Sequence, residues 1–214
     1  MSTNKALYTA ILGNYDDLKE PTIVSPGWDY ICFTDQDLSS SVWQIHKINY
    51  EGDPQRMARR IKILFHEYIK HEYSFWLDAA FHIHVDLNTF WNRYFQNPFT
   101  VPEHPLRNDI FREIESCLAN QRGNPEELNK QKQDYEKLNL KRFNGIITSG
   151  VMMRRNTDQV RELCEMWWAE LSKYSTRDQV AFAKVTQNWR IPMYKWDYSQ
   201  SKELKYTKHL KYRH

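Results

Sequence analysis

The chain has 214 residues, and its 30 basic and 27 acidic side chains give a formal net charge of +3. A chain of this length predicts one domain with a large core. Its 8 Trp, 13 Tyr and 10 Phe supply the apolar burial that disordered chains lack. The mean hydropathy of −0.79 and the lack of any long apolar run argue against a membrane span. Because the start shows no secretory pattern, we expect a cytoplasmic protein, and the small charge excess does not indicate a nucleic-acid partner.

Strand-like and helical stretches alternate along the chain. Apolar runs bounded by turn residues predict strands at residues 6–12, 30–34, 42–48, 75–85 and 145–153. Helical periodicity and capping signals predict helices at residues 54–71, 111–118, 160–171 and 177–185. Residues 120–141 form a polar insertion, with a surface helix expected to start near Pro125. This alternation predicts an α/β domain over residues 1–200, with a mostly parallel central sheet flanked by helices.

Residues 201–214 form a basic C-terminal tail, in which five Lys or Arg face one acid, Glu203. Such a tail is typically a solvated end of the chain. The alternative is a contact with anionic lipid, where each basic residue adds about 1 kcal/mol of attraction. That alternative would make the protein peripheral to a membrane.

Two loops at predicted strand ends carry polar residues, and in a parallel sheet ligands bind outside the carboxyl ends of the strands. Gly13, Asn14 and Tyr15 follow the first strand and could grip a base and a ribose. An ordinary turn is the alternative, because Gly and Asn are common turn residues. Asp35 ends the second strand and could bind ribose hydroxyls, although turn capping is equally common.

An arginine cluster follows Pro54 at the start of the predicted helix. Arg56, Arg59 and Arg60 fall within one arc of about 100° on a helical wheel. Guanidinium groups near a helix start suit a diphosphate. A salt-bridged solvent face is the alternative.

Asp78 lies inside the apolar stretch at residues 75–85. A carboxylate there is costly to bury without a partner, so Asp78 is a candidate functional residue. In a regular strand its side chain shares a face with His82 and His84. This set could bind a divalent ion, whereas core histidines bonded to backbone groups are the alternative.

In combination, these motifs resemble a known family. The chain is similar to the glycosyltransferase-like domain of plant cell-wall proteins and of bacterial and viral polysaccharide loci, formerly catalogued as a domain of unknown function. The resemblance covers roughly residues 7–184. The segments that carry it are Tyr8 to Tyr15, Tyr30 to Asp35, Arg59-Arg60-Ile61-Lys62, Trp76-Leu77-Asp78, His104-Pro105-Leu106-Arg107, Trp167-Trp168 with Glu170, and Arg177-Asp178-Gln179.

The resemblance implies a single Rossmann-like domain of the GT-A type, acting as a nucleotide-sugar transferase. It implies that Asp178 is the catalytic carboxylate, as a general base in an inverting reaction or an electrostatic stabiliser in a retaining one. Gln179 would contact the donor sugar or the acceptor. His104 and Arg107 would close over the phosphates, with a helix cap as the alternative. Trp167 and its neighbour are more typical of core than of sugar stacking.

One departure concerns the metal. Many such enzymes carry Asp-x-Asp, whose last acid binds Mn²⁺ or Mg²⁺, and here that place is taken by Ala80. The resemblance therefore leaves two ways to neutralise the leaving diphosphate. Asp78 with a histidine holds the ion, or arginines and lysines act without one.

We therefore expect a glycosyltransferase of polysaccharide biosynthesis that moves a sugar from a nucleoside diphosphate, most simply a UDP-sugar, to a hydroxyl of a glycan or glycoconjugate. Two alternatives remain. One is an inert nucleotide- or glycan-binding module of the same fold, and the other is a nucleic-acid binder that uses the basic tail and aromatic residues. The assignments are Gly13, Asn14, Tyr15 and Asp35 for the nucleoside, Arg56 and Arg60 for the diphosphate, and Asp78 for the metal or ribose.

Overall fold

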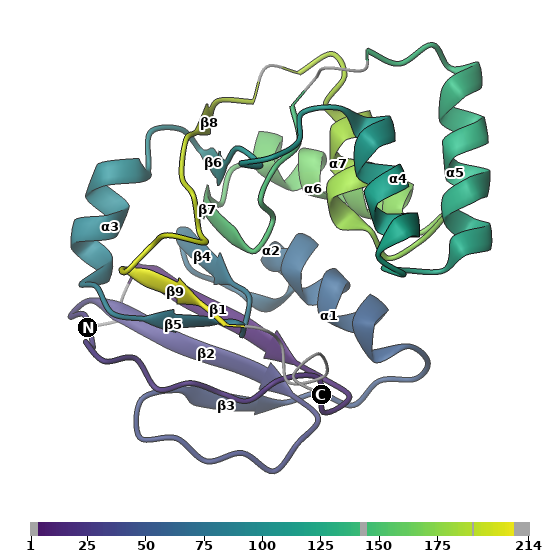
Figure 1. The fold of residues 1–214 in the computed structure, drawn as a ribbon. Helices are drawn as coiled ribbons and strands as arrows, with labels where there is room; N and C mark the ends of the chain where they lie inside the picture. Colours follow the sequence, from purple (N-terminus) through teal and green to yellow (C-terminus); the bar gives the residue numbers. More distant parts are fainter. Residues whose placement is uncertain (1–3, 142–144, 190, 208–214) are drawn as a thin grey trace.

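The computed structural model describes residues 4–141, 145–189 and 191–207. Within these residues one seven-stranded sheet has the order β3-β2-β1-β4-β7-β6-β8 (Figure 1). Its strands are β1 Lys5–Ile11, β2 Trp28–Thr34, β3 Gln44–Lys47, β4 Tyr73–Leu77, β6 Phe99–Pro102, β7 Val151–Arg155 and β8 Met193–Tyr194. Strands β1 to β4 are parallel, and β7 runs antiparallel to both β4 and β6. The predicted α/β class with a mostly parallel sheet is confirmed.

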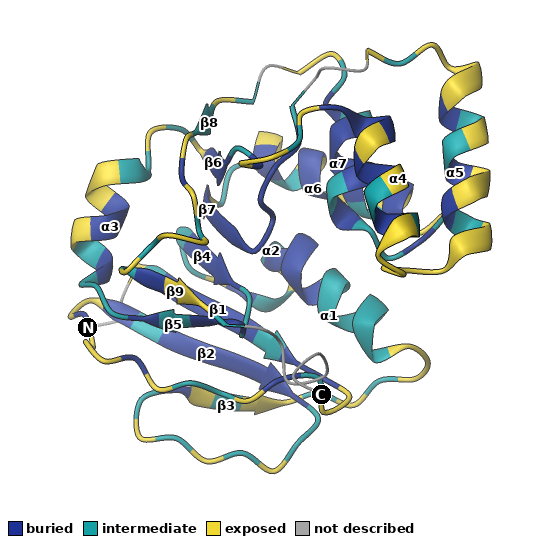
Figure 2. Ribbon diagram, in the orientation of Figure 1, coloured by how far each residue is buried: buried dark blue, intermediate teal, exposed yellow. Residues whose placement is uncertain are grey.

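Helices pack on both faces of this sheet. Their bounds are α1 Pro54–Ile63, α2 Phe65–Tyr68, α3 Leu87–Tyr94, α4 Ile110–Ala119, α5 Pro125–Lys137, α6 Asp158–Leu171 and α7 Asp178–Val185. Successive residues of β1 alternate between the two cores, as the pleat of a strand requires. Tyr8 packs with residues of α1, α2, α6 and α7, whereas Leu7 packs with residues of α3 on the other side of the sheet. The buried strands and the exposed outer helix faces are visible in Figure 2.

The expected strand at residues 75–85 is in fact two strands. Strand β4 ends at Leu77, the chain turns through Asp78 and Ala80, and β5 Phe81–Ile83 leaves the main sheet. The amide of Phe81 donates to the carbonyl of Asp78 at 3.0 Å, which closes the turn. The turn places Asp78 at the end of a central strand rather than within one.

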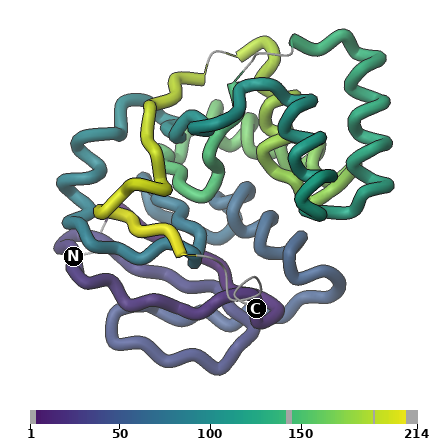
Figure 3. Tube along the Cα trace, viewed as in Figure 1, coloured from purple at the N-terminus to yellow at the C-terminus, as the bar shows by residue number. Residues whose placement is uncertain are grey.

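The basic tail also differs from the expected solvated end over residues 201–207. Strand β9 Leu204–Tyr206 pairs antiparallel with β5, so two segments far apart in the sequence lie side by side (Figure 3). Leu204 is fully buried, and Thr207 donates from its amide and its hydroxyl to the carbonyl of Ala80. Apolar burial and strand pairing therefore hold this stretch against the loop that carries Asp78. The basic residues at positions 208–214 lie outside the described residues.

The expected helix over residues 54–71 is interrupted at Leu64, where ψ is 49°. The cause is a buried arginine of β7. Arg154 donates to the carbonyl of Lys62 at 2.9 Å, and the hydroxyl of Tyr8 donates to the same oxygen at 3.0 Å. This carbonyl accepts from side chains instead of the amide four residues later, so α1 ends and the short α2 begins.

The polar insertion at residues 120–141 contains the expected helix, α5, whose first residue is Pro125. The side chain of Asn124 caps it by accepting from two backbone amides. Leu128 and Tyr135 are fully buried against α4, and the hydroxyl of Tyr135 donates to Glu170 at 2.8 Å. The insertion is thus docked on the domain. None of the helices in the described ranges is long and apolar enough to cross a membrane.

Candidate functional site

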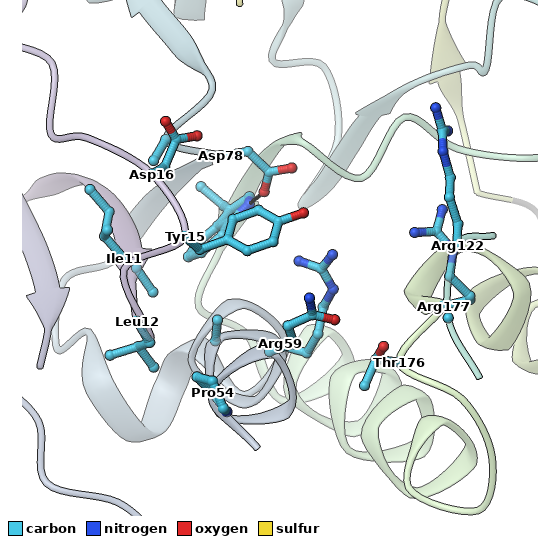
Figure 4. Close-up of a pocket in the computed structure, with 16 residues that line it drawn as sticks. Ile11, Leu12, Tyr15, Asp16, Pro54, Arg59, Asp78, Arg122, Thr176 and Arg177 are labelled. Carbon is cyan, nitrogen blue, oxygen red and sulfur yellow. Dashed lines mark hydrogen bonds between the residues drawn. The ribbon is translucent and has the colours of Figure 1, made fainter. Parts of the chain in front are cut away.

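A cleft opens at the carboxyl ends of β1 and β4, beside α1 (Figure 4). It consists of two adjoining pockets, and the wider one encloses about 520 Å³, within the range of about 300–1,000 Å³ that small-molecule sites occupy. The residues that line both pockets are Tyr15, Arg59, Asp78, Arg122 and Arg177. The cleft therefore has the position that parallel sheets favour for ligands.

The narrower pocket has an apolar floor. Ile11 and Leu12 reach it from the end of β1, and Pro54 and Ala58 line it from α1. The ring of Tyr15 lies over this floor and points toward the arginines on the far side (Figure 4). A flat apolar recess with one aromatic wall can hold a nucleobase.

The other residues that the sequence assigns to the nucleoside lie beside this pocket, and Gly13 is not among its lining residues. The amide of Gly13 donates to Asp35 at 2.8 Å, and the hydroxyl of Tyr50 donates to the same carboxylate oxygen at 2.8 Å. Asp35 thus ties the loop after β1 to the loops that follow β2 and β3. Neither Asp35 nor Asn14 is among the described residues that line the two pockets. Their contact with a nucleoside stays a prediction.

Substituting Gly13 should destabilise the protein more than substituting a second glycine of similar backbone geometry. Gly13 has φ of +64°, and a Cβ there would lie 2.7 Å from a ring carbon of Pro54. Gly52 has φ of +89° and no atom within 4 Å of the same position. Both alanine variants bear a positive-φ cost of about 1 kcal/mol, but only Gly13→Ala also displaces the start of α1. Urea denaturation should show the larger loss for Gly13→Ala, and equal losses would contradict the close packing.

The arginines of α1 are arranged differently from the sequence-based expectation. Of the described arginines of α1, Arg59 lines the cleft. Arg56 and Arg60, which the sequence assigned to the diphosphate, do not line it. Arg56 donates to the carbonyl of Tyr174 at 3.0 Å, and Arg60 pairs with Glu67 at 2.9 Å. The three arginines lie on one helix, as expected. After the break that follows α1, Glu67 lies beside Arg60 and pairs with it, so the guanidinium of Arg60 does not reach the cleft.

The start of α1 is also already capped. The carboxylate of Asp53 accepts from the amides of Gln55 at 3.0 Å and Arg56 at 3.2 Å. A diphosphate at this helix start, as the sequence suggested, would have to compete with that carboxylate. The cationic side chains deeper in the cleft are the better anion ligands.

Asp78 reaches the cleft. Its side chain is 22% exposed, and its Oδ1 accepts from the indole of Trp76 at 2.6 Å and lies 3.4 Å from Nζ of Lys62. The two histidines expected beside it face elsewhere. His82 bonds the carbonyl of Glu20, and His84 bonds the hydroxyl of Thr22. Because the chain turns between Asp78 and β5, Asp78 does not share a face with the two histidines.

The residues of the cleft do not fit a Mn²⁺ or Mg²⁺ ion. Across the described residues there is no group of three or more His, Cys, Asp or Glu that could hold a metal. Ala80, which stands at the second acid of Asp-x-Asp, is fully buried. The position between Asp78 and Asp178 is taken by the ammonium of Lys62, and these ions prefer oxygen ligands. We derive no chemical step through a metal.

Asp178 is the first residue of α7 and is the most tightly bound carboxylate of the cleft. Its Oδ2 lies 2.7 Å from Nζ of Lys62 and 3.5 Å from Nε of Arg59, and it accepts from the hydroxyl of Ser149 at 3.0 Å. Burial alone would raise the pKa of this carboxyl. The charges of Arg59, Lys62 and Arg177 outweigh burial and hold the pKa of Asp178 well below its ordinary value.

The remaining predicted residues line the wider pocket. Gln179 donates to the carbonyl of Ile147 at 2.5 Å, which fixes its amide at the pocket wall. Nδ1 of His104 accepts from the amides of Leu106 and Arg107, both at 3.1 Å, so His104 does cap this turn. Arg107 pairs with the buried Glu113. His104 and Arg107 also line the pocket, so the capping role of His104 does not exclude contact with a ligand.

Sequence reasoning did not assign several residues that line the cleft. Lys62 was visible within the Arg-Arg-Ile-Lys segment and lies three residues after Arg59, which places the two on neighbouring faces of a helix. The others come from segments that only the folded chain brings together, namely Arg122 of the polar insertion, Ser149, Arg177, and Tyr198 and Tyr206 of the C-terminal region.

The chain thus has a mixed, mostly parallel α/β sheet with a charged cleft at the carboxyl ends of β1 and β4. Residues 32–210 match the family model described as "TOD1/MUCI70, glycosyltransferase-like domain", and the chain belongs to this family. It is also 22% identical over 225 aligned positions to "Probable hexosyltransferase MUCI70" of Arabidopsis thaliana. The alignment covers 87% of this chain and 39% of that protein, so the chain spans well under half of its relative. The family resemblance noted in the sequence is confirmed.

Proposed function

We propose that the protein is a hexosyltransferase that moves a sugar from a nucleoside diphosphate donor, most simply a UDP-sugar, to a hydroxyl of a glycan or glycoconjugate. The family and the name of the relative support sugar transfer. The observation that carries the donor class is the convergence of Arg59, Lys62, Arg122 and Arg177 on one cleft. Cations brought together from α1, the insertion and the start of α7 suit a pyrophosphate.

The two pockets accommodate such a donor in order along its length. The apolar floor with Tyr15 receives the base. Arg59 lines both pockets, so the diphosphate would lie beside its guanidinium at their junction. The sugar then enters the wider pocket, where Gln179 and the backbone at Gly150 form the wall. Asp78 has both of its described contacts on Oδ1, which leaves Oδ2 to accept from a ribose or sugar hydroxyl.

The environment of Asp178 favours an electrostatic role over proton abstraction. A general base works best when its pKa lies near the operating pH, and the pKa of Asp178 is held far below that range by three cationic neighbours. Its side chain is only 3% exposed. We therefore assign Asp178 to fixing Arg59 in the orientation that the diphosphate needs.

A nucleotide panel tests the donor class. Thermal unfolding is measured with UDP, GDP, ADP and UMP, all at one common concentration of about 100 times the Kd for UDP. A ligand at 100 times its Kd stabilises the folded state by about 2.7 kcal/mol, so UDP should raise the Tm clearly and UMP much less. Indifference to every nucleotide, together with salt-sensitive binding of RNA or DNA, would support the nucleic-acid alternative instead.

Turnover is tested with Asp178→Asn. We expect slow hydrolysis of a UDP-hexose by the wild-type protein and a loss of about 100-fold in kcat in the variant, because the cations at the diphosphate lose their anchor. Asp158→Asn is the matched control, since Asp158 is also the first residue of a helix but its side chain is 99% exposed. A wild-type protein that binds UDP yet never hydrolyses or transfers a UDP-hexose would be the inert module.

A further inference from the structure

Lys62 is the most deeply buried cation of the cleft. Its side chain is 1% exposed, and its ammonium contacts three oxygens from separate segments. They are Oδ2 of Asp178 at 2.7 Å, Oγ of Ser149 at 3.2 Å and Oδ1 of Asp78 at 3.4 Å. The charge is thus placed between the two carboxylates that face the cleft from the ends of β4 and α7.

The backbone of Lys62 is held as firmly as its side chain. Its carbonyl accepts from Arg154 and from Tyr8, at the point where α1 ends. The ring of Trp76 lies 5.6 Å from the ammonium, and the same indole donates to Asp78. Because a lysine side chain is flexible in water, this number of restraints on one ammonium indicates that its position matters.

The geometry points to Lys62 as a built-in replacement for the divalent cation. We propose that its ammonium bridges Asp78 and Asp178, neutralises them and allows the cleft to bind the nucleoside diphosphate without a metal ion. Lys62 acts here as a positioning residue, since it is nearly sealed from solvent and works through the two carboxylates. The diphosphate itself is then contacted by more exposed cations, first among them Arg59.

This role has a physical reason. Two unneutralised carboxylates would repel an incoming diphosphate, and Ala80 supplies no third acid to complete a metal site. A tethered ammonium removes that repulsion with no ion to recruit. The inference rests on the proposed function only in that UDP must bind.

The first test is metal dependence of binding in the wild-type protein. The Kd for UDP is measured by calorimetry in EDTA and again in 1 mM Mn²⁺, while the free Mn²⁺ signal is followed by electron paramagnetic resonance. We expect Kd values within about twofold and no depletion of free Mn²⁺ beyond that caused by the same concentration of UDP without protein. A Kd at least about tenfold weaker in EDTA would overturn the inference and leave the proposed function standing. Absence of UDP binding in both conditions would instead contradict the proposed function.

The second test removes the charge. Lys62→Met keeps most of the unbranched side chain and removes the ammonium, and we expect UDP to bind at least about tenfold more weakly to this variant in EDTA. Lys130→Met is the matched control, since Lys130 is exposed on α5 and pairs with Asp134. A folded Lys62→Met protein that binds UDP as the wild type does would overturn the inference.

A double variant separates this role from a merely structural one. Adding Asp78→Asn to Lys62→Met removes the negative charge that the missing ammonium leaves unneutralised, while the amide keeps an oxygen that can accept from a ribose or sugar hydroxyl. The double variant should therefore bind UDP more tightly than Lys62→Met alone, although both lack the lysine. If Lys62 only supported packing, the second substitution would bring no recovery, and that result would contradict the bridging role.

Discussion

Replacing Arg59 with alanine should weaken the binding of UDP by about 10- to 100-fold. Arg59 lines both pockets and lies at their junction, where the diphosphate of the donor would pass. Removing a hydrogen bond to a charged group costs about 1.5–3 kcal/mol, which corresponds to that range of Kd. The measurement is the Kd for UDP by calorimetry, with circular dichroism to show that the variant is folded.

Arg60→Ala is the matched control for this experiment. Arg60 is the next residue on the same helix, and its guanidinium pairs with Glu67 on α2 outside the cleft. Its removal should change the Kd for UDP by less than about twofold. If Arg60→Ala weakened binding as much as Arg59→Ala, the diphosphate would lie on the other side of α1 and the donor position proposed above would be wrong.

Replacing Arg154 with alanine should destabilise the fold by about 3–5 kcal/mol. Arg154 is fully buried, its guanidinium centre lies 4.3 Å from the ring of Phe65, and it donates to the carbonyl of Lys62 and to the hydroxyl of Tyr8. Truncation leaves both a cavity and polar groups that lose their donor, and these two costs add. Urea denaturation followed by tryptophan fluorescence measures the loss.

The neighbouring Arg155 provides the control. Its side chain is about half exposed and pairs with Glu72 at the surface, and such pairs contribute little to stability. Arg155→Ala should therefore leave the urea midpoint nearly unchanged. Similar losses in the two variants would show that the contacts of Arg154 beneath α1 do not hold the end of this helix.

Arg59 and Arg154 are expected to differ because the cleft depends on the core beneath it. Arg154 sets where α1 ends, the end of α1 sets the position of Lys62, and Lys62 joins Asp78 to Asp178. Loss of Arg154 should thus affect UDP binding as well as stability, whereas loss of Arg59 should affect binding with little change in the fold. The Arg154 substitution removes a contact in the core, whereas the Arg59 substitution removes a side chain of the cleft itself.

Local patterns predicted most of the scaffold. Alternating apolar residues identified β1 and β2 to within about two residues, and Pro125 marked the start of α5. Short or weakly patterned elements were missed, among them β6, β8 and β9, which are four residues or fewer. Such strands form because a partner strand is already in place, and no local signal in the sequence carries that information.

The site was predicted in kind but only partly in detail. Asp78, Asp178 and Tyr15 all line the cleft, and the roles that the sequence assigns to them stay predictions. A helical wheel could not show that Arg59 and not Arg60 lines the cleft. Arg60 pairs instead with Glu67, which follows the break at Leu64. The two histidines expected beside Asp78 bond Glu20 and Thr22 instead, because the chain turns after Asp78, and metal binding itself stays an untested expectation.

The sequence by itself determined the α/β class, the family and the kinds of side chain available to the cleft, because periodicity, turn residues and motifs are local properties of the chain. Only the tertiary structure decided which cations meet the two acids. Lys62, Arg122 and Arg177 come from three segments far apart in the sequence. They converge because α1 and α7 pack in one core cluster and α4, which precedes Arg122, packs against α7. Cations neutralise the two acids only at distances of a few ångströms, and the folding of the chain determines these distances.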